Sequence, residues 1–353
     1  MINTWIARII LSPFALLYWI IIQIRNFLYE VGLLKSIKFD IPIVSVGNLN
    51  TGGSGKTPMI EYLIRHLNNY IDVGVLSRGY KRNTKGYLEV LPDSPYKSVG
   101  DEPLFLKKKY PHIPVTVGEE RALAIPQMLQ NHEELKAILL DDAYQHRGVN
   151  PYINILLTDY NSRFTKDYIL PMGRLREPRS SKSRADAIVV TKCPPDLSLA
   201  EQEKIKNEIA PLDHQVLMFS SLVYHTAYNI FNNTERILLN DQAVFLMTGI
   251  ANPQPIIDYL SEKNVTFFHR KFADHHAFTK HDIATVVDSY QKMEGQKKIF
   301  LTTEKDLIRI EPHFDYFLKH KIVIFALPIE VRFLNNPDVF LDWVKEKMTN
   351  FKV

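Results

Sequence analysis

The stretch from Ile41 to Ile60 constrains what this chain can fold into more than any other. It begins with an apolar run, Ile43 to Val46, that predicts a buried strand, and it ends in a helical pattern of apolar residues. Between the two lies a polar, glycine-rich loop made of Asn50, Thr51, Gly52, Gly53, Ser54, Gly55, Lys56 and Thr57. This is the layout of a phosphate-binding loop, in which backbone amides and the helix N-terminus point at an anion. We therefore predict that the loop binds a nucleoside triphosphate.

Lys56 and Thr57 have separate expected tasks in this loop. Lys56 can reach the outer phosphates, and the hydroxyl of Thr57 is placed to ligate Mg²⁺. Asn50 departs from the strict motif, which has glycine at that position. The alternative interpretation is a glycine-rich turn that only caps a helix, but the complete strand-loop-helix layout favours nucleotide binding.

The length and composition of the chain allow two domains and a reducing environment. At 353 residues the chain can build two cores, and strands alternate with helical patterns on both sides of a polar region near 195–240, interpreted as a linker. We predict an α/β fold with an N-terminal helix in 1–35, a doubly wound, mainly parallel sheet in 36–215 and a smaller α/β domain in 216–353. The net charge of +4 gives no argument for nucleic acid. Cys193 is the single cysteine, which excludes an internal disulfide.

The N-terminal segment differs in composition from the rest of the chain. The stretch from Ile9 to Ile24 carries no charge, and aromatic and basic residues flank it: Trp5, Tyr18, Trp19, Tyr29, Arg8, Arg25, Lys35 and Lys38. This mixture is typical of a helix that lies in the interface of an anionic leaflet. The stretch is short for a full membrane span, and a buried core helix is the alternative. Whether the helix spans the membrane or lies on it stays open.

Two polar segments early in the chain carry candidate binding residues. The strand Val73 to Leu76 leads into a basic loop that contains Arg78, which fits either the ligand edge of an α/β sheet or a solvated turn. Farther on, Asp101 and Glu102 begin a helical run. They could complement the helix dipole, provide a catalytic base or hold Mg²⁺, and their residue types do not decide between these roles.

A second pair of acids ends the predicted strand Lys136 to Leu140. Asp141 and Asp142 follow it directly, and an apolar strand that ends in aspartate is the usual partner of a phosphate loop, because the carboxylate orders the Mg²⁺ hydration shell. We therefore predict a metal site here rather than a helix cap. His146, close behind, has no assigned role from its sequence context alone.

Two further segments carry candidate chemistry. The segment 163–184 is the most basic of the chain, and it lies between two predicted strands, so we expect it to face an anion. Asp274, His275 and His276 stand together at a predicted strand-to-helix junction. Histidine beside an acid can transfer protons, but neighbouring histidines are also common as metal ligands or surface residues.

With these motifs in place, the chain resembles the tetraacyldisaccharide 4'-kinases of the lipid A pathway over most of its length. The order of the matching blocks is more specific than any single block. They are Val46 to Asn48, Gly52 to Pro58, Ser77 to Tyr80, Gly100 to Pro103, Asp141-Asp142 with Gln145-His146, Leu175 to Pro178, Gly249 to Pro253, Asp274 to His276 and Thr303 to Asp306. Asn50 is less unusual in this context, because the family is relaxed at that position.

The resemblance implies a P-loop kinase that moves the γ-phosphate of ATP to the 4'-hydroxyl of a tetraacyldisaccharide 1-phosphate lipid and forms lipid IVA. Asp101 would be the catalytic base, His275 would pair with it across a domain cleft, and Lys56 would hold phosphates. The sequence leaves open whether His275 or His276 makes that contact. The expected metal residues are Thr57, Asp141, Asp142 and Glu177. The expected substrate contacts are Arg78, Gln145, His146, Arg174 and Arg176.

The resemblance also sets the expected surroundings. The cofactors would be ATP and Mg²⁺, and the partners a lipid disaccharide and an anionic membrane surface, with no nucleic acid. We expect a monomer at the cytoplasmic face of the bacterial inner membrane. Two other hypotheses combine the same features: a membrane-associated switch or targeting ATPase, and a soluble small-molecule kinase with a buried N-terminal helix.

Overall fold

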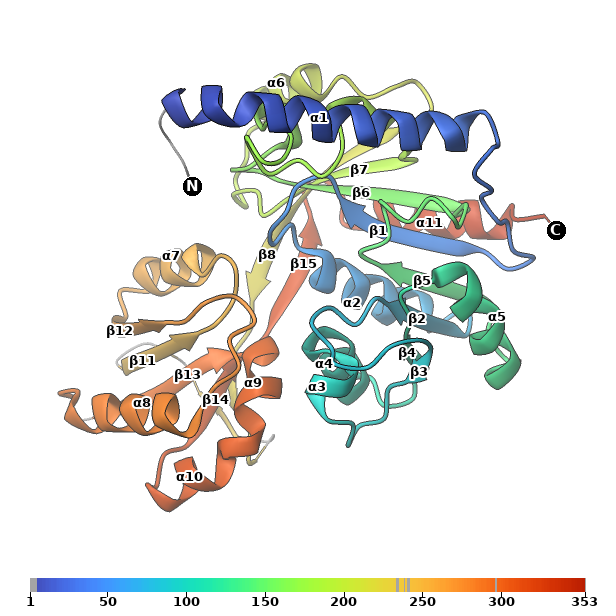
Figure 1. Ribbon diagram of the computed structural model, residues 1–353. Coiled ribbons are helices and arrows are strands. Elements are labelled where there is room, and N and C mark those ends of the chain that lie inside the picture. Colours follow the sequence, from blue (N-terminus) through green and yellow to red (C-terminus); the bar gives the residue numbers. More distant parts are fainter. Residues whose placement is uncertain (1–4, 233–234, 238, 240–241, 296, 353) are drawn as a thin grey trace.

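The larger of two α/β units is built on a nine-stranded sheet (Figure 1). The computed structural model describes residues 5–232, 235–237, 239, 242–295 and 297–352. The strand order is β15-β8-β7-β6-β1-β5-β2-β4-β3. The strands are β1 (Ile43–Asn48), β2 (Val73–Ser77), β3 (Leu88–Glu89), β4 (Val115–Val117), β5 (Ala137–Asp141), β6 (Ile153–Asp159), β7 (Ala187–Thr191), β8 (Val216–Tyr224) and β15 (Ile329–Phe333). Only the edge strands β3 and β15 pair antiparallel, so the predicted doubly wound, mainly parallel sheet is confirmed.

Helices cover both faces of this sheet. In β6, Ile155 and Leu157 face one core and Leu156 faces the other, the alternation of a strand buried on both sides. One face carries α2 (Lys56–Leu67), α4 (Asp101–Lys109) and α11 (Val339–Thr349). The other face carries α5 (Arg121–Asn131) and α6 (Leu199–Ile209). The short α3 (Tyr96–Val99) directly precedes α4.

The smaller unit repeats the α/β plan on a six-stranded sheet of order β10-β9-β14-β13-β11-β12. Its strands are β9 (Ala227–Asn229), β10 (Arg236–Ile237), β11 (Ala243–Thr248), β12 (Thr266–Lys271), β13 (Lys298–Thr303) and β14 (Ile324–Leu327). Its helices are α7 (Gln254–Glu262), α8 (Lys280–Lys292), α9 (Glu304–Ile310) and α10 (Phe314–Lys319). Two separate apolar clusters lie on the two faces of this sheet.

The chain passes between the units twice, along the antiparallel pair β8 and β15 (Figure 1). At the crossing, the amide of His225 donates to the carbonyl of Pro328 at 3.0 Å. Both strands belong to the larger sheet, and α11 packs against the core of the larger unit. The boundary at residue 215 therefore needs correction, because 216–224 and 329–349 belong with the larger unit.

The polar range 195–240 is not the linker that we expected. It holds α6, whose first turn is capped by the side chain of Ser198, which accepts from the amide of Glu201. Ile205 and Ile209 of this helix pack against β7 in a buried cluster. Glu203, Lys204 and Lys206 of α6 face solvent, and this amphipathic pattern was hidden in a segment of mixed composition.

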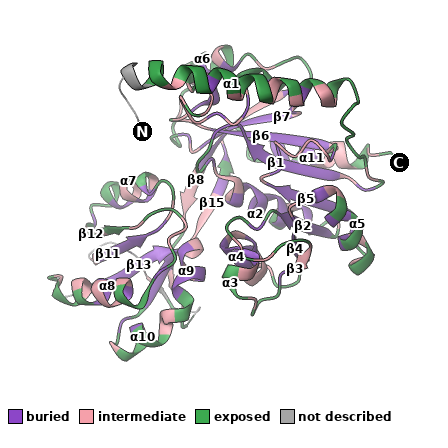
Figure 2. Ribbon diagram, viewed as in Figure 1, coloured by how far each residue is buried: buried purple, intermediate pink, exposed green. Residues whose placement is uncertain are grey.

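The N-terminal helix α1 (Trp5–Glu30) lies on the outside of the larger unit, and Figure 2 shows it mostly exposed. Its apolar side chains face outward: Ile10, Phe14 and Leu17 are 63%, 62% and 58% exposed. Arg8 to Glu30 is long and apolar enough to cross a membrane, and only 11% of that span is buried. The core-helix alternative is therefore wrong for this segment.

The assignment of α11 to the larger unit predicts a stability difference between two neighbouring positions. Phe340 is fully buried and stacks on Phe333 of β15 with ring centroids 4.4 Å apart, whereas Val339 is 45% exposed. Phe340→Ala should lower the free energy of unfolding by about 3–5 kcal/mol, because it leaves a cavity in the core. Val339→Ala should cost less than about 1 kcal/mol. Urea denaturation measures both, and equal losses would contradict the assignment.

Candidate active site

The phosphate loop lies between β1 and α2 and is fixed by neighbouring strands. Gly52 and Gly55 take φ values of 117° and 86°, which are open to glycine and strained for other residues. Thr191, at the end of β7, donates its hydroxyl to the carbonyl of Ser54 at 2.8 Å, and Lys192 donates to the carbonyl of Gly53. Ser54, Gly55 and the start of α2 are thereby held at the carboxyl edge of the sheet, where ligands bind in open α/β folds.

Asn50 has a structural task of its own. Its side chain donates to Asp167 Oδ2 at 2.9 Å, and its backbone bridges to Leu175. Asn50 is not among the described residues with positive φ, so nothing at this position requires glycine. Asparagine at this position therefore ties the loop to the segment 167–175.

Lys56 lies in a network of side chains from the ends of β1 and β5 and from the loop that carries Arg176. Its Nζ is 3.3 Å from Asn48 Oδ1 and 3.6 Å from Asp142 Oδ1. Arg176 pairs with the same two residues, with Nη2 3.0 Å from Asp142 Oδ1. Burial alone would raise the pKa of Asp142, but the charges of Lys56 and Arg176 lower it. Asp142 is therefore ionised and orients both cations at the phosphate loop.

Asp141 is the buried carboxylate at the end of β5. Ser77, at the end of β2, donates to its Oδ2 at 3.2 Å, and within the described part of the chain its Oδ1 has no partner. Burial and the negative charges of Glu102 and Asp142 raise the pKa of Asp141. An unpartnered carboxylate oxygen among like charges is what an added cation would stabilise.

Glu177 lies apart from this pair. It is fully buried and pairs with Arg184 at 2.5 Å and with Arg25 of α1 at 3.7 Å. Among the residues described, no three or more acids, histidines or cysteines gather as a metal cluster. The place of Glu177 in a metal shell stays a prediction, and in this structure the residue connects α1 to the loop that carries Arg176.

Asp101 and His275 meet across the two units. Asp101 begins α4 in the larger unit, and its Oδ2 accepts a hydrogen bond from His275 Nδ1 of the smaller unit at 2.8 Å. His276 turns away and bonds Asp282 at 3.0 Å, so the structure selects His275 of the two histidines. Burial alone would raise the pKa of Asp101, but the hydrogen bond from His275 and the charges of Lys305, His275 and Arg309 lower it to about 2. Asp101 is therefore a carboxylate near neutral pH.

Asp101 is close to the phosphate loop. The next residue, Glu102, accepts a hydrogen bond from the hydroxyl of Thr57 at 3.4 Å, which joins the N-termini of α4 and α2. A cavity of about 260 Å³ opens beside Asp101. It is lined by residues of both units: Tyr80, Lys81, Asn83, Tyr96, Lys97, Gly100, Asp101, His275, Ala277 and Arg309. A hydroxyl in this cavity would lie against the Asp101 carboxylate.

The sequence reasoning missed two cations of α9. Lys305 pairs with Glu102, and Arg309 pairs with Asp101 at 3.3 Å. Only the block Thr303 to Asp306 pointed to this helix, through the family resemblance and with no assigned role. Helical spacing could have placed Lys305 and Arg309 on one face of α9, but it could not have shown which carboxylates they meet.

The basic segment 163–184 does not face an anion as a whole. Arg163 and Lys166 pair with Glu208, Arg174 pairs with Asp167, and Arg184 pairs with Glu177. The expectation fails because carboxylates of the protein already neutralise these cations: Asp167 and Glu177 lie within the segment, and Glu208 lies in α6. Arg176 is the member that reaches the phosphate-loop network.

The expected substrate contacts differ in their freedom to bind a ligand. Arg78 is exposed beside the carboxyl edge of the sheet. Gln145 donates to the carbonyl of Asn48 at 2.9 Å, and Arg174 is held by Asp167. Burial and the charges of Arg121 and Arg78 lower the pKa of His146 to about 4, so its ring is neutral near pH 7. The contacts with a substrate stay predictions.

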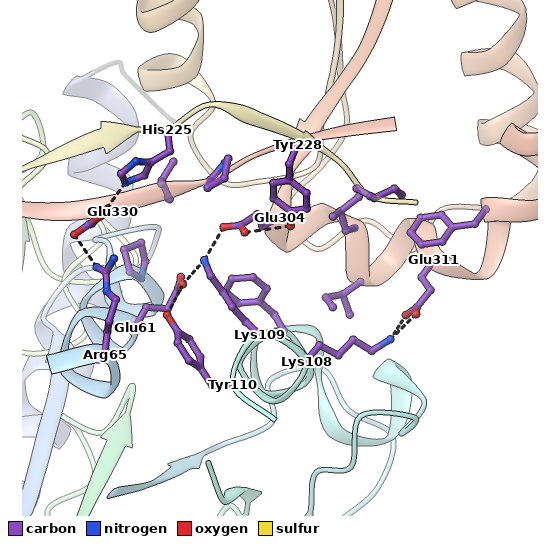
Figure 3. A pocket seen from close by; sticks show the side chains of 18 residues that line it. Glu61, Arg65, Lys108, Lys109, Tyr110, His225, Tyr228, Glu304, Glu311 and Glu330 are labelled. Carbon is purple, nitrogen blue, oxygen red and sulfur yellow. Dashed lines mark hydrogen bonds and ion pairs between the residues drawn. The ribbon is translucent and has the colours of Figure 1, made fainter. Parts of the chain in front are cut away.

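A larger cavity, of about 650 Å³, separates the units on the side of α2 and α4 that faces β8 and β15 (Figure 3). Lys109 lies 2.6 Å from Glu61 of α2, within the larger unit. Two ion pairs cross between the units: Lys109 lies 2.7 Å from Glu304 of α9, and Lys108 lies 2.5 Å from Glu311. Together with the pairs of Lys305 and Arg309, they fix α9 on α4.

Comparisons with known proteins agree with this geometry. Residues 7–349 match the family described as tetraacyldisaccharide-1-P 4'-kinase. A tetraacyldisaccharide 4'-kinase of Phocaeicola vulgatus is 40% identical over 95% of this chain and 92% of its own length. One of Flavobacterium johnsoniae is 39% identical over 97% and 99%. The crystal structure described as the "apo" form of LpxK from Aquifex aeolicus in complex with ATP has a TM-score of 0.74 and 29% identity, and covers 97% of this chain and 99% of that one.

Proposed function

The chain belongs to the tetraacyldisaccharide 4'-kinase family, and we propose how its own residues transfer the γ-phosphate of ATP to the 4'-hydroxyl of a tetraacyldisaccharide 1-phosphate lipid, which forms lipid IVA. The observation that carries the proposal is the pair Asp101–His275, which lies beside a cavity and one residue from the contact between Glu102 and the phosphate loop. The donor enters at the loop and the acceptor at the cavity.

ATP binds at the loop between β1 and α2. The backbone amides of Gly52 to Gly55 and the start of α2 face its phosphates, and Lys56 contacts the outer ones. The related Aquifex aeolicus structure, described as a complex with ATP, supports ATP as the nucleotide. When ATP binds, Lys56 exchanges part of its contact with Asn48 and Asp142 for phosphate oxygens.

Asp101 accepts the proton of the acceptor hydroxyl. Sugar hydroxyls have very high pKa values, so the proton leaves as the bond to phosphorus forms and not before it. A carboxylate whose pKa is about 2 is a weak base, but it is ionised at neutral pH and ready to accept. His275 Nδ1 donates to Asp101 Oδ2, and the amide of Glu102 donates to Oδ1 at 3.0 Å, so the acceptor hydroxyl would donate to the remaining lone pair of Oδ1. Lys56 and Arg176 offset charge that develops on the transferring group.

The residues at the carboxyl edge fit Mg²⁺, which prefers oxygen ligands. The hydroxyl of Thr57 and the free Oδ1 of Asp141 would hold it, with Asp142 and Glu177 as further candidates. When bound, Mg²⁺ supplies positive charge to the β- and γ-phosphates. The raised pKa of Asp141 fits a carboxylate that meets a cation only when the nucleotide is loaded.

The helix α1 brings the enzyme to the lipid. The acyl chains of the acceptor stay in a bilayer, so the enzyme must reach the bilayer surface. The outward apolar side chains of α1, with Lys35 and Lys38 beyond its C-terminal end, suit the interface of an anionic leaflet. We place the chain as a monomer on the cytoplasmic face of the inner membrane, where ATP is available.

The transfer assay tests this function directly. Purified protein, γ-labelled ATP and the disaccharide 1-phosphate lipid in mixed micelles should give labelled lipid, with little ATP turnover when the lipid is omitted. A membrane-associated switch ATPase would instead hydrolyse ATP without the lipid. Absence of labelled lipid would remove the proposed function.

The role of Asp101 predicts a selective loss. Asp101→Ala should lower kcat by at least ~100-fold, because a general base contributes that much, and should leave ATP affinity nearly unchanged. Asp315→Ala removes an exposed acid from the first turn of α10 and should match wild type. Initial rates and calorimetric ATP titration measure the two effects, and wild-type turnover in Asp101→Ala excludes Asp101 as the base.

The metal site predicts a dependence on pH. Because the pKa of Asp141 is raised, its protonated form becomes significant as the pH falls towards neutrality and competes with Mg²⁺. The Mg²⁺ concentration for half-maximal activity should therefore rise between pH 8 and pH 6. In Asp141→Asn that concentration should be raised at least ~10-fold and be less sensitive to pH. An unchanged Mg²⁺ requirement in this variant would show that Asp141 does not hold the metal.

The membrane role of α1 is tested on its exposed face, so that the fold is left intact. The triple variant Phe14→Ser, Leu17→Ser, Ile21→Ser removes side chains that are 62%, 58% and 54% exposed. It should shift the protein from the pellet to the supernatant when anionic vesicles are sedimented, because less apolar surface of α1 can be buried in the bilayer. Leu123→Ser, which removes a 66% exposed leucine from α5, should still pellet. Equal pelleting of both variants contradicts the role.

A further inference from the structure

Arg309 of α9 is a buried cation with contacts in both units. It is 2% exposed, and its Nε lies 3.3 Å from Asp101 Oδ2 in the larger unit, an ion pair that lacks hydrogen-bond geometry. Within the smaller unit it pairs with Asp306 and donates to the carbonyl of Gly249 at 2.9 Å and to that of His276 at 3.3 Å. One guanidinium therefore touches the base and the two loops around His275.

These two loops determine where His275 stands. The amide of His275 donates to the same Gly249 carbonyl at 3.1 Å that accepts from Arg309. His275 has a φ of 56°, a left-handed conformation that costs energy for a residue with a side chain and persists only where neighbours fix it. Arg309 is one of those neighbours, because it donates to the carbonyl of His276, the next residue, and to the Gly249 carbonyl that accepts from the amide of His275. It is thus connected to both partners of the Asp101–His275 hydrogen bond.

Arg309 is itself held rigidly. Asp306, its partner, accepts from the hydroxyl of Thr303 at 2.8 Å and from the amide of Gly249 at 3.1 Å. The Phe278 ring covers the guanidinium, with its centroid 5.7 Å from Cζ. Beside Arg309, Ile308 packs into the core of the larger unit and anchors α9 on α4. A guanidinium held through its two terminal nitrogens keeps its positive charge at a fixed distance from the carboxylate and can orient it, which a mobile lysine does less well.

We propose that Arg309 is a positioning residue for the kinase reaction, which holds the carboxylate of Asp101 in the orientation that His275 and the acceptor hydroxyl require. This inference rests on the proposed function. Arg309 and Asp101 lie in different units, so the base is correctly placed only while α9 is seated on α4. The ion pairs Lys109–Glu304 and Lys108–Glu311 at the other end of α4 keep this arrangement (Figure 3).

The competing explanation is that Arg309 only helps the smaller unit to fold. Three of its contacts, to Asp306, Gly249 and His276, lie inside that unit. The two explanations differ in what a variant loses. A positioning residue lowers kcat and leaves the KM values of ATP and lipid nearly unchanged, whereas a folding defect lowers the amount of active protein and the thermal midpoint.

The test uses Arg309→Ala and Arg309→Lys in the full-length protein, with Arg332→Ala on the exposed side of β15 as the matched control. Arg309→Ala should lower kcat by at least ~30-fold, with each KM within about threefold of wild type, and Arg309→Lys should recover part of the loss. Guanidinium ion at tens of millimolar should raise kcat of Arg309→Ala at least threefold, because it replaces the missing group, and should not raise that of Arg332→Ala or Asp101→Ala.

The outcomes separate the two proposals. Wild-type protein that makes no labelled lipid removes the proposed function and this inference with it. If the wild type is active and Arg309→Ala has an unchanged kcat, the inference alone is overturned. A loss in Arg309→Ala that neither guanidinium nor lysine restores, together with a lowered thermal midpoint, assigns Arg309 to folding and also overturns it.

Discussion

The Asp101 carboxylate is the point at which the two units depend on each other. Its Oδ2 meets His275 at 2.8 Å and Arg309 at 3.3 Å, both from the smaller unit, while Asp101 itself begins a helix of the larger one. A buried carboxylate without these partners would be protonated more readily, and only the amide of Glu102, which donates to Oδ1 at 3.0 Å, would orient it. His275 and Arg309 of the smaller unit therefore keep this carboxylate ionised beside the phosphate-binding loop of the larger unit, and neither unit provides this arrangement alone.

Much of the fold could be predicted because it follows local rules. Apolar runs such as Ile43 to Val46 are strands of a sheet buried on both faces, and the glycine-rich loop sits where strand, loop and helix order requires. The antiparallel return of β15 could not be predicted in this way. Its place beside β8 depends on a pairing between residues about a hundred positions apart, for which the strand itself carries no signal. For the same reason, α11 was assigned to the wrong unit.

Many residues of the candidate site could be predicted from the sequence, but the contacts between them could not. The residues from Asn50 to Thr57, with Asp141 and Asp142, could be found from motif and strand position. The contact between Asp101 and His275 spans 174 positions, and only the family resemblance connected the two residues. The cations of 163–184 were misjudged because the sequence shows their charge but not which carboxylate each one meets, such as Glu208 for Arg163. Arg309 was missed for the same reason.

The most direct test of the account is a double-mutant cycle between Asp101 and His275, measured by kcat in the lipid transfer assay. If the two side chains act together as one pair, the variant Asp101→Ala/His275→Ala should be no more than about twofold slower than Asp101→Ala alone. Losses that multiply, so that the double variant is slower by the product of both single effects, would contradict the account and show that the two residues act independently.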